Sequence, residues 1–356
     1  MRNIEFHNRE KEIKEIRAIL DRQPTLITFI YGPINSGKTE LINHVIEELP
    51  EEYVVFYINL RTKFLASYDD FIESLFEMEM ETEAALKKGK ETLAELVSSV
   101  TKVAGIPITR EFLDYVFKDK KPKNGFSYII KLFEEVKNSG KQPVLILDEL
   151  QKIGDVKVDG FLIYELFNFF IDLTKEKHLA HVFVATSDSL FIEQIYNEAM
   201  LQGRCRYLLV DDFDKDTALN FFDECGFDDR EKELAWNYCG GKPVYLVELL
   251  RVEDRGKMVE RMLKIRTSQI SELLNSLRAY GEKIEFRGEL YEIVYDNVIE
   301  ELSKLKENVN CAYEYITPEI TYLVRNNIVF VEPLENTMRA QSRLDLLAIR
   351  EVLKDV

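Results

Sequence analysis

The sequence predicts an α/β fold: a parallel five-stranded sheet, followed by a helical lid and a C-terminal winged-helix domain. Three observations support this fold class. Apolar, strand-like runs alternate with helical patterns through the first 210 residues, which is typical of a parallel sheet covered by helices. A glycine-rich G-x4-G-K-T loop directly follows the first run. A later run ends in two adjacent carboxylates.

Five runs rich in Val, Ile, Leu and Phe are expected to form the strands. They show little alternation between apolar and polar residues, as strands buried on both faces do. The runs are Thr25–Tyr31, Tyr53–Asn59, Pro143–Asp148, His181–Thr186 and Arg206–Val210. A helix is expected before the first strand, over Arg9–Leu20, because its isoleucines recur at helical spacing. Residues 61–140 form an insertion between the second and third runs, which is expected to add amphipathic helices.

After Val210 the pattern becomes helical. Asp214 is expected to begin one helix, Asp228 or Asp229 a second that ends at Gly240, and Pro243 a third. Farther on, residues 327–331 and 338–340 predict two short strands around a turn, the pattern of a β-wing. We therefore expect three units: an α/β core over residues 1–211, a helical lid over 212–265 and a winged-helix domain over 266–356.

The glycine-rich loop carries the strongest chemical signal. Its residues are Gly32, Pro33, Ile34, Asn35, Ser36, Gly37, Lys38 and Thr39, with Glu40 next. A helix is expected to start at about Lys38, so that loop N–H groups point at a bound phosphate. Lys38 is expected to bridge the β- and γ-phosphates, and Thr39 to hold Mg²⁺. The loop therefore predicts a P-loop NTPase, which binds a nucleoside triphosphate.

The run ending in Asp148 and Glu149 has a Walker B pattern. At a strand edge beside the P-loop, Asp148 would reach Mg²⁺ opposite Thr39. Glu149 would then polarise the attacking water as a general base. The alternative is an acidic strand end that only caps a following helix. Because two acids stand together, the pattern favours hydrolysis over binding alone.

Composition limits the class of protein. With 46% hydrophobic and 31% charged residues, the 356-residue chain is expected to be a soluble globular protein of two or three domains. No apolar stretch reaches the roughly 20 residues of a membrane span, and the first residues form no apolar signal region. Four scattered cysteines without a C-x-x-C pair argue against a zinc site. We expect a cytoplasmic protein that does not contact a membrane.

The net charge of −17 disfavours sequence-blind attraction to nucleic acid. From Arg251 to Val356, however, 16 basic residues stand against 19 acidic ones, so any DNA contact is expected in this third of the chain. A basic face there could combine Arg278, Arg287 and Arg325 with Arg339 or Arg343. The expected wing carries Glu332 and Glu335 and no basic residue, which favours protein docking over DNA binding.

Several short motifs together resemble the archaeal ATPase family, in the STAND class of AAA+-related P-loop NTPases. The resemblance covers roughly residues 4–250. Besides the P-loop, the matching motifs are Asn8-Arg9-Glu10, Leu147-Asp148-Glu149-Leu150-Gln151, Val184-Ala185-Thr186-Ser187, Gly203-Arg204 and Gly240-Gly241-Lys242-Pro243. The resemblance implies ATP or ADP as the nucleotide, Mg²⁺ as the metal and an AAA+-like sheet with a lid.

The resemblance also implies roles for single residues. Asn8 and Arg9 would lie near the adenine, unless they only cap a helix and stay solvated. Thr186 or Ser187 would take the sensor-1 position near the γ-phosphate, and strand register decides which.

Two further motifs leave their roles open. Arg204 matches the position of an arginine finger, acting in cis, in trans or merely in a surface ion pair. Gly241 and Pro243 would dock the lid over the base, and Lys242 lies where a lid residue could approach the phosphates.

These features predict an ATP-hydrolysing switch in which the nucleotide sets the orientation of the lid and the winged helix. The alternative is an ATP-regulated DNA-binding protein of the regulator or initiator type. A third possibility is a scaffold that binds nucleotide and scarcely turns it over. A protein partner, or self-assembly, is expected through the winged helix or the 61–140 insertion.

Overall fold

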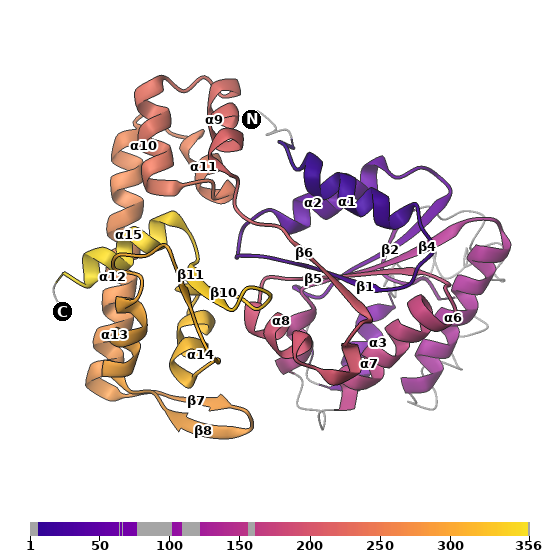
Figure 1. The fold of residues 1–356 in the computed structure, drawn as a ribbon. Coiled ribbons are helices and arrows are strands. Elements are labelled where there is room, and N and C mark those ends of the chain that lie inside the picture. The colour runs from indigo at the N-terminus through magenta and orange to yellow at the C-terminus, as the bar shows by residue number, and fades with distance from the viewer. Residues whose placement is uncertain are drawn as a thin grey trace, which may run out of the picture.

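The computed structural model describes residues 6–63, 65, 67–76, 102–108, 122–155 and 161–354. Figure 1 shows an α/β core on one side and, on the other, a helical unit above a C-terminal unit of helices and short strands. Within the described residues, no helix is both long and apolar enough to cross a membrane.

The core is built on a parallel sheet with the strand order β3-β2-β4-β5-β1-β6. All five predicted strands are present, as β1 (Ile27–Tyr31), β2 (Tyr53–Asn59), β4 (Gln142–Asp148), β5 (His181–Thr186) and β6 (Cys205–Leu209). A sixth strand, β3 (Lys102–Ala104), joins the outer edge of β2. The sequence analysis did not predict β3, because three residues are too few for a recognisable apolar run.

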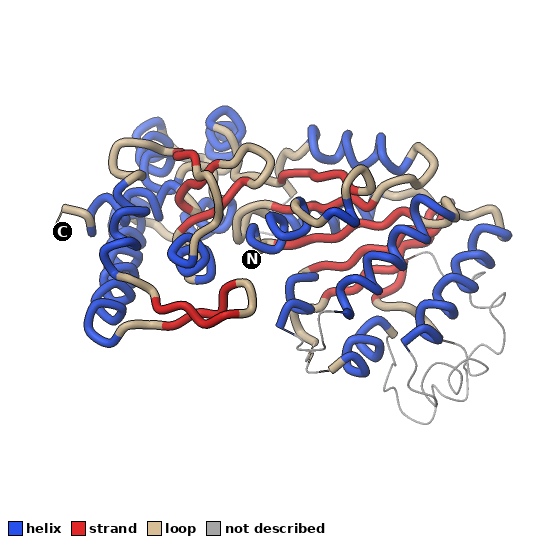
Figure 2. Tube along the Cα trace, turned by 60° about the horizontal axis from the view of Figure 1, so that its bottom comes forward, coloured by secondary structure: helices blue, strands red, loops and turns tan. Residues whose placement is uncertain are grey.

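Helices cover both faces of the sheet (Figures 1 and 2). On one face, α1 (Glu10–Leu20) and α2 (Lys38–Glu48) share a buried cluster with Ile30 and Phe183. On the other, α3 (Tyr68–Leu75), α6 (Pro122–Asn138), α7 (Phe161–Ile171) and α8 (Ser189–Tyr196) pack against Phe29, Phe56 and Leu145. Burial on both faces explains why the strands lack alternation.

Short turns complete the core. Two 3₁₀ segments cover Leu150–Asp155 and Ala199–Leu201, and a π-helical turn over Asp172–Glu176 follows α7. The expected helices of the 61–140 insertion appear as α3 and α6, and residues 64, 66, 77–101 and 109–121 of that insertion lie outside the described residues.

The register of the sheet brings the predicted motifs to one edge. Tyr31, the last residue of β1, pairs with Thr186 at the end of β5. Asp148 pairs with Asn59 on one side and Ala185 on the other. The P-loop, the Walker B acids and the end of β5 therefore meet at the carboxyl edge, where parallel α/β sheets bind ligands.

The helical unit contains α9 (Lys215–Glu224), α10 (Asp229–Cys239) and α11 (Pro243–Leu249). The predicted helix starts are confirmed: Asp214 caps α9, and Asp228 forms a capping box with Glu231 at the start of α10. Gly240, with a φ of 59°, ends α10.

The C-terminal unit begins with a long helix, α12 (Arg255–Tyr280), which packs against α10 and α15. Its three-stranded antiparallel sheet has the order β10-β11-β9, and the two predicted wing strands are the hairpin β10–β11. The other elements are the hairpin β7 (Lys283–Phe286) and β8 (Glu289–Glu292), then α13 (Tyr295–Ser303), β9 (Asn310–Ala312), α14 (Pro318–Arg325), β10 (Val329–Glu332), β11 (Thr337–Ala340) and α15 (Arg343–Val352). Because α12 runs through residues 265 and 266, the predicted boundary between the lid and the winged-helix domain falls inside one helix.

Candidate functional site

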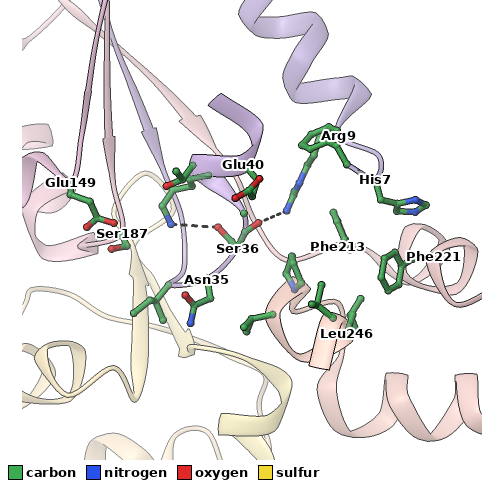
Figure 3. A pocket seen from close by; sticks show the side chains of 18 of the residues that line it. His7, Arg9, Asn35, Ser36, Glu40, Glu149, Ser187, Phe213, Phe221 and Leu246 are labelled. Atoms are coloured by element: carbon green, nitrogen blue, oxygen red, sulfur yellow. Dashed lines mark hydrogen bonds between the residues drawn. The ribbon is translucent and has the colours of Figure 1, made fainter. Parts of the chain in front are cut away.

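A cavity of about 510 Å³ lies between the P-loop, the N-terminal segment and α11. Figure 3 shows Glu149 and Ser187 at one end and His7, Phe213 and Phe221 at the other. The predicted site residues that line it are Arg9, Ile34, Asn35, Ser36, Gly37, Lys38, Thr39, Glu40, Glu149, Ser187 and Pro243. Phe6, His7, Arg61, Phe213, Phe221, Val244, Leu246 and Val247 also line it and were not predicted. One end is thus polar and the other largely apolar.

Backbone geometry requires glycine at positions 32 and 37 of the P-loop. A Cβ on Gly32 would lie 2.1 Å from the carbonyl oxygen of Val210, so only glycine fits there. Gly37 has a φ of 93° and directly precedes α2, whose N-terminus faces the cavity. Such a helix start presents unpaired N–H groups and a partial positive charge, which suits a phosphate.

The side chain of Lys38 is held by backbone carbonyl groups of the P-loop itself. Its Nζ donates to the carbonyl oxygens of Gly32 at 3.0 Å and Pro33 at 2.8 Å. Burial, together with the charge of nearby Lys242, lowers the pKa of Lys38 to about 8. The site therefore contains a desolvated cation that an anionic ligand would stabilise.

The side-chain oxygens of Thr39 and Asp148 meet at the predicted metal position. Thr39 Oγ1 donates to Asp148 Oδ2 at 2.9 Å, and Tyr57 Oη donates to the same oxygen at 3.0 Å. Hydroxyl and carboxylate oxygens are hard donors, and Mg²⁺ usually takes one or two protein ligands beside phosphates and waters. Thr39 and Asp148 thus fit a magnesium ion bound with a nucleotide. Tyr57 was not predicted, because its contact with Asp148 depends on the β2–β4 register.

Glu149 is 7% exposed and has a φ of 65°, a left-handed conformation. Arg61 forms an ion pair with its Oε1, and Gln151 Nε2 donates to Oε2 at 2.5 Å. The alternative expected from sequence, an acid that only caps a helix, does not match this buried position at the cavity wall.

The register question at the end of β5 has a clear answer. Ser187 lines the cavity, whereas Thr186 is fully buried and donates from Oγ1 to Gln151 Oε1 at 2.7 Å. Ser187 is thus the residue of the pair that a ligand could touch.

The N-terminal segment ties the loop to the helical unit. Arg9, only 6% exposed, donates to the carbonyl oxygens of Ser36 at 2.6 Å and Asp211 at 2.7 Å. Its guanidinium lies 4.6 Å from the ring centre of Phe213. Asn8 donates to Thr217 Oγ1 at 2.9 Å and does not line the cavity. The alternative of a solvated arginine is therefore wrong.

The Gly240-Gly241-Lys242-Pro243 motif leads into α11 and contacts the rest of the protein through the Gly241 backbone and the Lys242 side chain. A Cβ on Gly241 would lie 1.8 Å from the Phe213 carbonyl oxygen, and Gly241 accepts a hydrogen bond from the Phe213 N–H. Lys242, 2% exposed, donates to the Ile34 carbonyl oxygen at 3.0 Å and pairs with Asp212 at 2.9 Å. Burial raises the pKa of Asp212. Lys242 therefore reaches the P-loop, although Gly241 itself stays outside the cavity.

Arg204 lies at the opposite edge of the sheet. Its carbonyl oxygen accepts from the N–H of Ile27, at the start of β1, and its guanidinium donates to the Met200 carbonyl oxygen at 2.9 Å. The P-loop follows the other end of β1. A role in cis is therefore wrong, because Arg204 does not reach the cavity of its own chain.

Residues 6–249 match the family model described as an ATPase domain predominantly from Archaea. Residues 256–353 match a second model, the C-terminal domain of the MJ1010-like uncharacterized ATP-binding proteins. An uncharacterized ATP-binding protein of Pyrococcus abyssi is 50% identical over 349 residues, covering 98% of both chains. Another, from Methanocaldococcus jannaschii, is 45% identical over 368 residues and covers 99% of both.

Solved structures share the fold at low identity. The Walker-type ATPase PABY2304 of Pyrococcus abyssi aligns with a TM-score of 0.62 at 19% identity, covering 97% of this chain and 96% of that one. The ADP form of the Aeropyrum pernix ORC2 protein aligns with a TM-score of 0.50 at 11% identity, covering 99% and 96%. The family model spans most of the chain and the full-length relatives are nearly half identical, so the protein belongs to the family of ATPase domains found predominantly in Archaea.

Proposed function

We propose that this protein binds ATP with Mg²⁺, hydrolyses it, and acts as a conformational switch of the STAND class. The observation that carries the proposal is one cavity with the phosphate-binding loop and Glu149 at one end and an apolar wall at the other, and Asp148 is bonded to Thr39 of that loop. The names of the Pyrococcus and Methanocaldococcus relatives support ATP as the nucleotide.

Each group then has a role. Phe213, Phe221 and Leu246 offer an apolar wall to the adenine, while loop N–H groups and Lys38 bind phosphate. Thr39 and Asp148 would hold Mg²⁺, which when bound supplies positive charge beside the phosphates. Glu149 takes a proton from the attacking water, and Ser187 donates toward the γ-phosphate.

The described conformation is a resting one. Both Glu149 oxygens have a partner, Arg61 on one and Gln151 on the other, and we propose that a water takes the place of Arg61 when the nucleotide binds. Lys38 donates to Gly32 and Pro33 rather than outward. Nucleotide binding is therefore coupled to a rearrangement of the loop.

The loop is linked to both other units through one residue. Ile34 donates its N–H to Gln341 Oε1 at 3.3 Å, and its carbonyl oxygen accepts from Lys242. Gln341 is itself fixed to the C-terminal unit, because its Nε2 donates to the Val329 carbonyl oxygen at 3.0 Å. A change in the P-loop thus alters contacts with the lid and the C-terminal unit together.

The C-terminal unit docks on the core with its hairpin β10–β11 (Figure 1). Tyr31 donates to Glu332 at 2.6 Å, Arg339 pairs with Asp211 at 2.6 Å, and Phe330 lies in the buried cluster of the core. Helices α13 and α14 followed by this hairpin support a winged helix used for docking. We propose that release of this contact exposes the hairpin to a protein partner or a second copy; Arg204 could serve only such a copy, in trans.

An ATP-regulated DNA-binding role has less support. In α14, the helix before the hairpin, all residues from Ile320 to Val324 are buried. Arg339, one of the arginines of the expected basic face, pairs with Asp211 in this conformation and is not free for phosphates. All four cysteines are free thiols, which supports a cytoplasmic location.

The test is steady-state ATP hydrolysis with Mg²⁺ by the parent, Lys38→Ala and Glu149→Gln. We expect Lys38→Ala to lose binding and Glu149→Gln to keep binding while turnover falls by roughly 100-fold or more. Hydrogen exchange of β10–β11 is expected to rise when ATP is added. A Glu149→Gln variant that turns over ATP at the parent rate would show that the base is assigned wrongly.

A further inference from the structure

Gln151 connects the Walker B glutamate to the end of β5. It lies two residues after Glu149, in the 3₁₀ segment Leu150–Asp155. Its Nε2 donates to Glu149 Oε2 at 2.5 Å and to Ser187 Oγ at 3.4 Å. Its Oε1 accepts from Thr186 Oγ1 at 2.7 Å. One amide thus bridges Glu149 and Ser187, which line the phosphate end of the cavity, and the buried Thr186.

The hydrogen-bonding capacity of these groups fixes the orientation of the amide. An ionised carboxylate only accepts, so the nitrogen of Gln151 faces Glu149. Its oxygen then faces Thr186, whose hydroxyl donates its one proton to it. The Thr186 oxygen accepts from the Asp188 N–H at 3.1 Å. Both N–H groups of Gln151 and the Thr186 hydroxyl therefore have acceptors in this hydrogen-bond network.

The two partners of Glu149 differ in how firmly they are held. The Arg61 side chain is 62% exposed, and an ion pair in water contributes little to fixing a geometry. Gln151 is attached to Thr186, which is fully buried in the central sheet. Glu149 itself follows the strand in a left-handed conformation, so no regular element holds its side chain. Its firm attachment is therefore through Gln151.

We infer that Gln151 is a positioning residue for hydrolysis. It holds Oε2 of Glu149 against the end of β5, so that Oε1 is the oxygen that accepts the proton of water once Arg61 leaves. Gln151 does not line the cavity, so it acts through Glu149 and not on the nucleotide. The inference rests on the proposed ATPase activity and assigns one further residue to it.

The test compares Gln151→Met with a matched control, Gln142→Met. Gln142 lies at the other end of β4 and is also partly buried, with its Nε2 donating to the Leu179 carbonyl oxygen at 3.1 Å. For Gln151→Met we expect kcat to fall roughly 10- to 100-fold, because the base loses its orientation. KM for ATP and Kd for ADP should change less than about twofold. Gln142→Met should leave all three constants unchanged.

A second variant, Gln151→Asn, separates positioning from a merely structural role. It keeps an amide that can bond Thr186, but its side chain is one methylene too short to reach Glu149 Oε2 as well. Its kcat should therefore fall as in Gln151→Met, while its melting temperature stays closer to that of the parent. A structural role would make kcat follow the melting temperature across the two variants.

Unchanged kcat in Gln151→Met, or equal losses in kcat and ADP affinity, would overturn the inference while leaving the ATPase intact. A kcat that follows the melting temperature across Gln151→Met and Gln151→Asn would do the same. A parent chain that binds ATP without turnover would overturn the proposed hydrolysis and this inference together, so the two failures are distinguishable.

Discussion

Lys38 is a buried ammonium group with a second buried lysine, Lys242, nearby. Desolvation and like charge both disfavour its protonated form, which lowers its pKa from the ordinary 10.5 to about 8. The P-loop without a phosphate therefore stores unfavourable electrostatic energy, and an anionic ligand relieves it. This destabilisation has a definite dependence on pH.

The unfolded chain keeps the Lys38 proton up to about pH 10.5, whereas the folded chain loses it near pH 8. Between these values the unfolded state binds more protons, so the free energy of unfolding rises with pH. Relative to Lys38→Met, the nucleotide-free parent should gain at most about 3 kcal/mol across this window. Urea unfolding of both proteins at pH 7.5, 9 and 10 measures the difference. A constant difference would contradict the buried cation.

At the scale of the element, the short connections decide how the helical unit meets the core. Gly241 has no room for a side chain, because the Phe213 backbone lies against it. This contact places Lys242 on the P-loop and Pro243 at the start of α11. The helical unit is therefore positioned by contact between the backbones of Gly241 and Phe213.

Replacing Gly241 by alanine should lower the free energy of unfolding by about 2 kcal/mol or more, because the Phe213 backbone cannot give way cheaply. Thermal unfolding measures the effect, and ATP affinity should fall with it. Gly256→Ala, in the first turn of α12, is the matched control, since its Cβ would meet only ordinary contacts at 3.5 Å and beyond. It should be neutral or stabilising by up to about 1 kcal/mol.

Local signals predicted most elements and part of the site. The caps at Asp214 and Asp228 and the P-loop glycines act within a few residues, so the sequence alone indicates them. Tyr57 and Arg61 were missed because their partners lie about 90 residues away, at a strand register that periodicity does not give. Arg204 was matched to a motif. The pairing of β1 with β6 places it at the edge of the sheet opposite the P-loop.

For the whole molecule, the contact between Tyr31 and Glu332 joins the P-loop strand to the C-terminal unit. Burial raises the pKa of Glu332, and the Tyr31 hydroxyl partly offsets this shift by donating to its carboxylate. The second oxygen of Glu332 has no partner among the described residues. Among the docking contacts, the one made by the Glu332 carboxylate thus depends on the Tyr31 hydroxyl.

Tyr31→Phe removes that hydroxyl and should lower the free energy of unfolding by about 1–2 kcal/mol. Hydrogen exchange in β10–β11 should become faster, because the hairpin is held less firmly to the core. Tyr53→Phe is the control: it removes a hydroxyl that donates to the Leu20 carbonyl oxygen at 3.3 Å, far from the hairpin. Equal exchange rates in the two variants would show that Tyr31 does not hold the C-terminal unit.

The burial of Phe330 in the core constrains how genes of this family can recombine. The two family matches meet between residues 249 and 256, which suggests two exchangeable modules. Phe330, however, is fully buried in the large apolar cluster of the core, and Val331 donates its N–H to Ser189 Oγ in α8. Recombination at that boundary would remove Phe330 and expose the apolar surface of the core that it covers. The two halves are therefore expected to be inherited as a pair, with changes in β1 or α8 accompanied by changes in the hairpin.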